Sequence, residues 1–256
     1  MSVGFFYNIY CQFVHQRELH KGVYIMILIF DYFETLVNNG AMDFNRGLEP
    51  FWEKYYKDKC SFEEIRTFAE EMFQHMLEVQ STGREFPFVK EELPLYAEKF
   101  GGDVVTMNAD EEADFLMHCN EMQVIPGLAD MLLQFAEKNI PMYVISNSGF
   151  TAEALKIILQ RFAIGEYFTE LWSSADIGWV KPRKEIFDTA LEEVLKNHPG
   201  ATKEEIFYIG DTYKTDVIGA YDAGIKPVWI NRNGEADDKA YASYEIESIL
   251  DLIGVI

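Results

Sequence analysis

The sequence predicts an α/β fold: a Rossmann-like parallel sheet covered by helices on both faces, with an inserted α-helical cap domain. From Gln123 onward, short apolar runs typical of buried strands alternate with amphipathic helical stretches. This alternation is the pattern of βαβ units in a parallel sheet. The strongest strand signal, Ile25–Phe30, lies near the start of the chain instead. The helical stretch between the two, roughly residues 40–122, therefore interrupts the sheet after its first strand.

The first 25 residues stand apart from this pattern, because the strand signal includes a second methionine, Met26. Two interpretations stay open: residues 1–25 are a loose extension that folding does not need, or Met26 is the native start. We divide the chain into an N-terminal extension (1–25), an α/β core domain (26–39 and 123–256) and a helical cap domain (40–122).

The cap segment contains clear helix signals. Ser61–Glu64 has the form of a capping box, and a second helix is expected to start near Asp110. The apolar side chains expected to face inward from these two helices are Ile65, Phe68, Met72, Phe73 and Met76, and Phe115, Leu116 and Met122.

The core segment supplies the remaining strands and helices. The expected strands are 141–145, 171–172, 206–209 and 227–230. Pro126-Gly127 and Pro182 open two of the expected helices, because proline is favoured in a first helical turn. The expected helices are about 127–138, 151–161 and 182–196, with another that ends at Gly224.

The charge balance limits the partners. The chain has 43 acidic and 22 basic residues, a formal net charge of −21. Such a balance repels nucleic-acid backbones and anionic lipid, so neither a nucleic acid nor a membrane is expected as a partner. It does not exclude a small anionic substrate, because one lysine and one metal ion can reverse the field inside a pocket.

The cysteines and the apolar runs indicate a cytoplasmic protein. Cys11, Cys60 and Cys119 are far apart and odd in number, with neither zinc-ligand spacing nor a disulfide framework. No apolar run has the length that a membrane-spanning helix needs. The apolar stretch Val3–Val14 lacks a preceding basic residue, so a signal peptide is not expected.

Polar side chains follow the predicted strands at the edge where parallel sheets bind ligands. A lone aspartate at such a position usually caps a helix or forms a turn. Here, carboxylates, a hydroxyl and a cation of complementary chemistry come from four separate loops, which predicts a site. These residues are Asp31, Ser146, Asn147, Lys181, Asp211 and Asp216.

Four segments that carry these residues resemble, in order, the four motifs of the haloacid dehalogenase superfamily. They are Phe30–Leu36, Ile145–Asn147, Val180–Pro182 and Gly210–Asp216. The insertion falls where this superfamily carries a helical cap. The resemblance implies a Mg²⁺-dependent phosphatase that acts on a small phosphorylated metabolite through an aspartyl-phosphate on Asp31.

The resemblance also implies a role for each residue. Asp31 is the nucleophile, since a carboxylate can form an acyl phosphate that water then hydrolyses. Ser146 and Lys181 are the other catalytic residues, and together with Asn147 they bind the substrate. Hard oxygen ligands suit Mg²⁺, which cancels the repulsion between a carboxylate and a phosphate. The implied ligands are Asp31, the backbone carbonyl of Phe33, Asp211 and Asp216, the last directly or through water.

Phe33 departs from the pattern. Most phosphatases of this superfamily carry an aspartate there, which acts as general acid and then base, a role worth roughly 10²- to 10⁴-fold in rate. Hydrolysis of ordinary phosphate esters is therefore expected to be slow, whereas acyl phosphates need no acid. Glu34 is a poor replacement, because neighbouring side chains of an extended segment point to opposite sides. His75 and His118 in the insertion are the other candidates.

Two alternatives stay open. In a dehalogenase-type hydrolase, Asp31 attacks carbon and an aromatic residue occupies the position of Phe33, although such enzymes lack the carboxylate pair Asp211 and Asp216. The second alternative is a catalytically impaired protein that only binds a phosphorylated metabolite. The sequence has no motif of dinucleotide enzymes, P-loop NTPases, zinc proteases or serine esterases. It names neither the substrate nor the oligomeric state.

Overall fold

The core of the protein is a six-stranded parallel sheet, as predicted. The structure is a computed structural model that describes residues 26–41, 43–237 and 239–256, so the proposed extension 1–25 lies outside the described residues. The strand order is β5-β4-β1-β6-β7-β8, with every neighbouring pair parallel. The strands are β1 (Ile27–Phe30), β4 (Met142–Ser146), β5 (Glu170–Ser173), β6 (Ile206–Gly210), β7 (Lys226–Ile230) and β8 (Tyr244–Ile246).

Helices cover both faces of this sheet. Because side chains alternate along a strand, Leu28 and Phe30 of β1 enter one core, and Ile27 and Ile29 enter the other. The first core contains α6 (Leu128–Glu137), α7 (Ala152–Arg161) and the turns of η5 (Ile249–Gly254). The second contains α9 (Lys184–Asn197) and α10 (Ile218–Ala223). Short helical turns complete the core: η2 (Gly165–Tyr167), α8 (Ser174–Ile177), η3 (Lys203–Glu205) and η4 (Tyr213–Val217).

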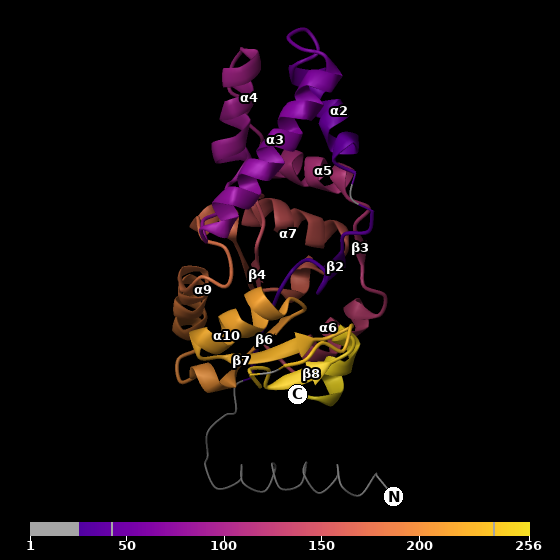
Figure 1. Cartoon of the computed structure of the whole chain (residues 1–256). Coiled ribbons are helices and arrows are strands. Elements are labelled where there is room, and N and C mark those ends of the chain that lie inside the picture. Colours follow the sequence, from indigo (N-terminus) through magenta and orange to yellow (C-terminus); the bar gives the residue numbers. More distant parts are fainter. Residues whose placement is uncertain (1–25, 42, 238) are drawn as a thin grey trace, which may run out of the picture.

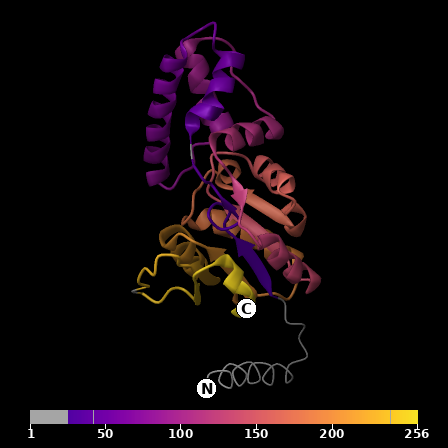
Figure 2. The same ribbon diagram turned by 90° about the vertical axis from the view of Figure 1, so that its right-hand side faces the viewer.

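The segment between β1 and β4 forms a helical insertion, which we define as residues 44–119. Two views show that its helices stand together beyond one end of the sheet (Figures 1 and 2). The chain enters and leaves it through a small antiparallel pair, β2 (Val37–Asn38) and β3 (Gln123–Val124). The helices are α2 (Phe44–Tyr55), α3 (Phe62–Ser81), η1 (Phe88–Glu92), α4 (Leu93–Phe100) and α5 (Ala109–Cys119).

The prediction for α3 is right at its start and wrong further along. Ser61 and Glu64 form the capping box, and Ile65 and Phe68 are buried. Phe73, expected to be buried, is 45% exposed. The 20-residue α3 is longer than the 12-residue α2 and the 8-residue α4, so its second half has less to pack against. Periodicity identifies the side chains that share a helix face, but not how far the packed neighbours extend.

The insertion also contacts the core away from its two connecting strands. Glu85 N–H donates to the carbonyl of Gly178, and Val180 N–H donates to the carbonyl of Gly83, both over 3.0 Å. The carboxylate of Glu85 is fully buried and accepts a hydrogen bond from the hydroxyl of Ser174. These contacts place the insertion against the segment that follows β5. Among the described residues, no helix has the length and apolar character to cross a membrane.

Candidate active site

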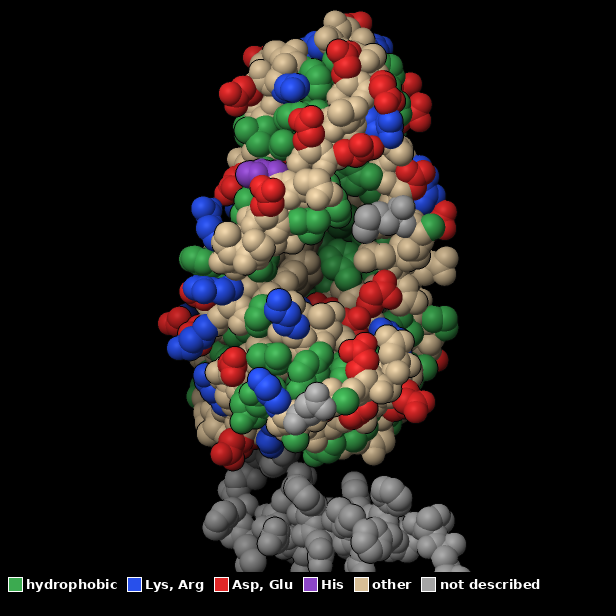
Figure 3. All heavy atoms as spheres, in the orientation of Figure 1, with side chains coloured by type: hydrophobic (Ala, Val, Ile, Leu, Met, Phe, Trp, Pro, Cys, Tyr) green, Lys and Arg blue, Asp and Glu red, His purple; other side chains and the backbone are tan. Residues whose placement is uncertain are grey.

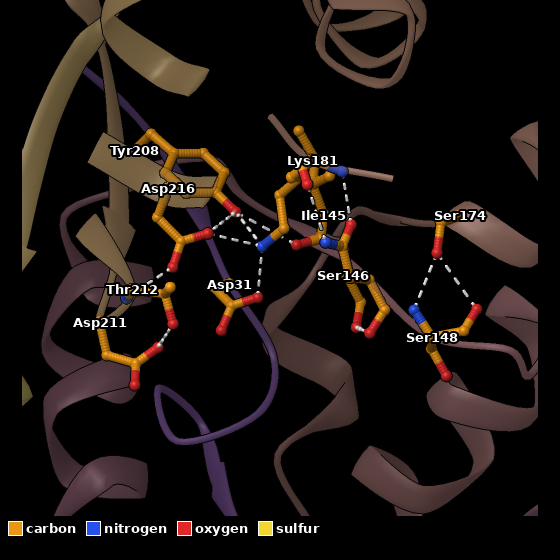
Figure 4. A network of polar contacts seen from close by, with 11 residues as sticks. Asp31, Ile145, Ser146, Ser148, Ser174, Lys181, Tyr208, Asp211, Thr212 and Asp216 are labelled. Carbon is orange, nitrogen blue, oxygen red and sulfur yellow. Dashed lines mark hydrogen bonds and ion pairs between the residues drawn. The ribbon is translucent and has the colours of Figure 1, made fainter. Parts of the chain in front are cut away.

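The sheet order brings the predicted polar residues together. β1 lies between β4 and β6, so the loops that follow these three strands are neighbours. Lys181, from the loop before α9, inserts its ammonium among them. Its Nζ lies 2.5 Å from Oδ1 of Asp31 and 2.7 Å from Oδ1 of Asp216 (Figure 4). All three side chains are buried, so the ion pairs are shielded from solvent and salt.

Asn147 and Ser146 occupy the end of β4, as predicted. The amide of Asn147 holds the backbone of Lys181 at both polar groups: Oδ1 accepts from Lys181 N–H over 2.7 Å, and Nδ2 donates to the Lys181 carbonyl over 3.2 Å. Ser146 is fully buried, and its hydroxyl donates to the Asn147 carbonyl over a long 3.4 Å. A better acceptor, such as a phosphoryl oxygen, would therefore displace a weak contact.

The electrostatics of the site depend on the balance between burial and charge. Burial raises the pKa of Asp31 above its ordinary value, and the Lys181 ammonium offsets part of this rise. Burial alone would lower the pKa of Lys181, but the carboxylates of Asp216 and Asp31 outweigh it, so the pKa is raised and the ammonium keeps its charge. Burial, followed by the nearby Asp216, also raises the pKa of Asp211. Additional positive charge would favour the ionised form of both aspartates.

The oxygen atoms at this edge fit a divalent cation. One carboxylate oxygen each from Asp31, Asp211 and Asp216 lies within 4.8 Å of the others, and such hard ligands suit Mg²⁺. Within residues 26–41, 43–237 and 239–256, neither Oδ2 of Asp31 nor the carbonyl oxygen of Phe33 accepts a hydrogen bond. Both oxygens of Asp216 are engaged, one by Lys181 and the other by Thr212 N–H over 2.9 Å. Asp216 is therefore better placed to orient the site than to bind a cation directly.

The position two residues after Asp31 holds an aromatic ring instead of an acid. Phe33 is half-buried, with its ring 4.7 Å from the ring of Tyr32. Glu34 turns to the connecting segment, where its Oε1 accepts from Asn39 N–H over 2.9 Å. His75 packs edge-on against Phe86 at 4.9 Å.

His118 lies 2.6 Å, through Nδ1, from the carbonyl oxygen of Asp114 in its own helix. Glu34, His75 and His118 thus make their contacts away from Asp31. None of these three side chains contacts the residues around Asp31. The structure therefore gives no replacement for the missing acid among the three candidates.

Two residues that sequence reasoning missed adjoin the site. The hydroxyl of Tyr208 lies 2.7 Å from Nζ of Lys181. The guanidinium of Arg232 bonds to the Glu34 carbonyl, with Nη1 3.7 Å from Oδ2 of Asp211. Tyr208 is typical of a core residue in an apolar strand, so no sequence signal marks it. Arg232 stands two residues after β7, an end-of-strand position that could have identified it.

The surface is hollowed between the insertion and the core, at the level where β2 lies in Figure 1 (Figure 3). A separate cavity of about 930 Å³ opens between α5 and α7. None of the predicted site residues lines it. Its lining includes Asn108, Glu112, Thr151, Lys156 and Asp176.

Comparison with known proteins assigns the family. Residues 28–230 match the haloacid dehalogenase-like hydrolase family. The match spans all four motif segments and the whole insertion. The chain belongs to this family. The resemblance inferred from the four motifs is thereby confirmed.

Several curated relatives of this chain are named as nucleotidases or phosphatases of different substrates. The chain is 31% identical over 129 residues to pyrimidine 5'-nucleotidase YjjG of Escherichia coli, covering 50% of this chain and 54% of the relative. It is 27% identical over 110 residues to glyceraldehyde 3-phosphate phosphatase of Methanothermobacter thermautotrophicus, covering 43% of this chain and 46% of the relative. The chain thus spans about half the length of the curated relatives it matches.

Solved structures of family members share the fold over nearly the whole chain. A HAD phosphatase from Thermococcus onnurineus aligns with a TM-score of 0.59 and 21% identity, covering 90% of this chain and 97% of its own. A 2-haloacid dehalogenase from Pseudomonas syringae aligns with a TM-score of 0.63 and 20% identity, covering 90% and 97%. A phosphatase and a dehalogenase therefore share this fold. The reaction of this chain has to be argued from its site and not from its fold.

Proposed function

We propose that the protein is a Mg²⁺-dependent phosphatase of a small phosphorylated metabolite, with Asp31 as the nucleophile. The observation that carries the proposal is the buried Lys181 ammonium shared by Asp31 and Asp216, with Asp211 beside them. Three carboxylates face two cationic groups, the Lys181 ammonium and the Arg232 guanidinium beside Asp211, and the remaining negative charge is what a divalent cation would offset. The phosphatases among the curated relatives support the same chemistry.

Each step would use groups that lie around Asp31. A carboxylate oxygen of Asp31 attacks phosphorus while the bond to the leaving oxygen breaks, and that oxygen departs with the bonding electrons. Water then attacks phosphorus, the bond to Asp31 breaks, and inorganic phosphate leaves. Lys181 holds Oδ1 of the nucleophile and balances charge on the phosphoryl group, and Ser146 and Asn147 contact its oxygens.

Magnesium, when bound, neutralises charge between the phosphate and the carboxylates. The ligands we propose are Asp31, the carbonyl of Phe33 and Asp211, with Asp216 acting through water. The helical insertion, including its connecting residues 40–43 and 120–122, would act as the cap that encloses the substrate. The proposed setting is the cytoplasm.

Phe33 narrows the substrate class. A phenyl ring has no proton to give to a leaving oxygen, and Glu34, His75 and His118 are engaged elsewhere. The best substrates would carry a leaving group that is stable as an anion, such as the carboxylate released from an acyl phosphate. Alkyl phosphates such as glyceraldehyde 3-phosphate and nucleoside monophosphates would react more slowly.

Phe33 also supports a second candidate, a dehalogenase in which Asp31 attacks carbon. That reaction needs no divalent cation, so the carboxylates of Asp211 and Asp216 would then have no metal ion to bind. A protein that binds a phosphorylated metabolite without turnover is the third candidate.

Turnover assays separate the three. Wild type, Asp31→Asn and the exposed control Asp130→Asn would be incubated with p-nitrophenyl phosphate and acetyl phosphate, with and without Mg²⁺. The proposal expects Mg²⁺-dependent phosphate release, faster from acetyl phosphate, lost in Asp31→Asn and kept in Asp130→Asn. Halide release from 2-haloacids without metal would instead establish the dehalogenase. If neither assay shows turnover but calorimetry shows that a phosphorylated metabolite binds, the third candidate, a binding protein without turnover, would be supported.

A further inference from the structure

Tyr208 is a buried residue in contact with the catalytic lysine but outside the predicted site. It stands on β6, three residues before Asp211, and its side chain is fully buried. Its hydroxyl oxygen accepts a hydrogen bond from Nζ of Lys181 over 2.7 Å. Figure 4 shows the hydroxyl, the ammonium and the carboxylate of Asp216 meeting at one point.

The ammonium of Lys181 has three N–H groups and needs three acceptors in a site without solvent. Asp31 supplies the first at 2.5 Å and Asp216 the second at 2.7 Å. Tyr208 supplies the third. We propose that Tyr208 is a positioning residue that fixes the Lys181 ammonium on the nucleophile Asp31.

The hydroxyl of Tyr208 is itself held in place. It lies 3.3 Å from the carbonyl oxygen of Ile145 and 3.3 Å from Oδ1 of Asp216, either of which can accept its proton. The ring packs against Phe187 of α9, with centroids 5.3 Å apart. Contacts from β4 and Asp216 thus hold the hydroxyl, and Phe187 of α9 packs against the ring.

Lys181 is consequently held at both ends. Asn147 bonds to its backbone, and Tyr208 bonds to its ammonium. The four-carbon stem between them would otherwise have free rotation about several bonds. Without the hydroxyl, the third N–H has no acceptor and the ammonium can move toward Asp216 alone. Oδ1 of Asp31 would then lose its hydrogen bond from Lys181, which orients the carboxylate for attack on phosphorus.

The kinetic effect rests on the proposed phosphatase function. Tyr208 does not touch the phosphoryl group in this arrangement, so its loss should slow the chemical step without weakening substrate binding. Hydrogen bonds to charged groups are worth enough to change a rate roughly 10- to 100-fold. Tyr208→Phe is therefore expected to lower kcat by roughly that factor, with KM changed less than about 2-fold.

The matched control is Tyr143→Phe. Tyr143 is also fully buried in the same core, on β4, and its hydroxyl contacts Nε2 of His198 over 2.8 Å, away from Lys181. Both variants and wild type would be assayed with acetyl phosphate and Mg²⁺. Activity would be expressed per folded molecule, with the folded fraction measured by circular dichroism at 10 °C. Tyr143→Phe should keep the kcat of wild type. An equal kcat for Tyr208→Phe and wild type would overturn the proposal, and so would a rise in KM at constant kcat.

A crystal structure of Tyr208→Phe tests the inference without turnover. We expect the Lys181 ammonium to move out of hydrogen-bond distance of Oδ1 of Asp31. An unchanged Lys181–Asp31 contact would refute the positioning role even if activity fell. Absence of turnover in wild type, by contrast, would refute the phosphatase function and leave the structural result as the test of Tyr208.

Discussion

Replacing Glu92 with glutamine is expected to stabilise the protein, and to do so more strongly at higher pH. Glu92 ends η1 in the insertion and is only 8% exposed. Its carboxylate accepts one hydrogen bond, from the hydroxyl of Tyr96 over 3.3 Å. Burial raises the pKa of Glu92 from 4.5 to about 7, although the bond from Tyr96 lowers it in part.

The sign of the pH dependence follows from these two pKa values. Below pH 4.5 the carboxyl is protonated in both the folded and the unfolded chain, and Glu92 costs nothing. Between pH 4.5 and about 7 the unfolded chain loses the proton first, so stability falls as pH rises. Above about pH 7 the stability no longer falls with pH, because the carboxyl is ionised in both the folded and the unfolded chain. At about 1.4 kcal/mol per pH unit, the gap between the two pKa values amounts to about 3 kcal/mol.

Glutamine keeps the acceptor for Tyr96 but has no charge to bury. Urea unfolding at pH 5.5 and 8.5 should therefore show Glu92→Gln more stable than wild type by about 1 and about 3 kcal/mol respectively. Glu98→Gln, an exposed change on the neighbouring α4, is the control and should shift stability by less than about 0.5 kcal/mol at both pH values. A Glu92→Gln stability that equals wild type at pH 8.5 would refute the reasoning.

Three further predictions concern the site. Phe33→Asp should raise hydrolysis of alkyl phosphates by roughly 10²-fold or more while changing acetyl phosphate turnover little; equal gains on both substrates would contradict the missing-acid explanation. Gly210→Ala should abolish turnover, because a Cβ there would lie 2.5 Å from Cγ of Asp216; Gly254→Ala, with open space around it, is the control, and full activity of Gly210→Ala would show that Asp216 can move freely. Removal of divalent cations with EDTA should stop phosphate release, and added Mg²⁺ should restore it; activity that persists after exhaustive chelation would exclude the proposed metal dependence.

Much of the fold could be predicted because its signals are local. The apolar runs of β4, β6 and β7 and the cap at Ser61 are contiguous in sequence, and each appears where expected. The structure adds elements too short to leave a pattern. β2 and β3 have two residues each and β8 has three, fewer than the four or more that periodicity needs.

Most polar residues of the candidate site could be predicted from the sequence, whereas Tyr208 and Arg232 were missed. Aspartates and a lysine that follow buried strands are conspicuous, and the sheet order brings them together. The same reasoning does not identify Tyr208, because a tyrosine among Ile206, Phe207 and Ile209 is typical of a buried strand. Which acceptors the lysine uses depends on side-chain packing between β6 and α9, and only coordinates reveal it.

The backbone bonds between the insertion and the loop before Lys181 have a mechanical consequence. Val180, which donates to the carbonyl of Gly83, directly precedes the lysine in the chain. An insertion that swings outward must either break this bond or pull the lysine's own segment with it. A tilt of α3 that keeps this bond intact would therefore move the segment that carries the Lys181 ammonium beside Asp31.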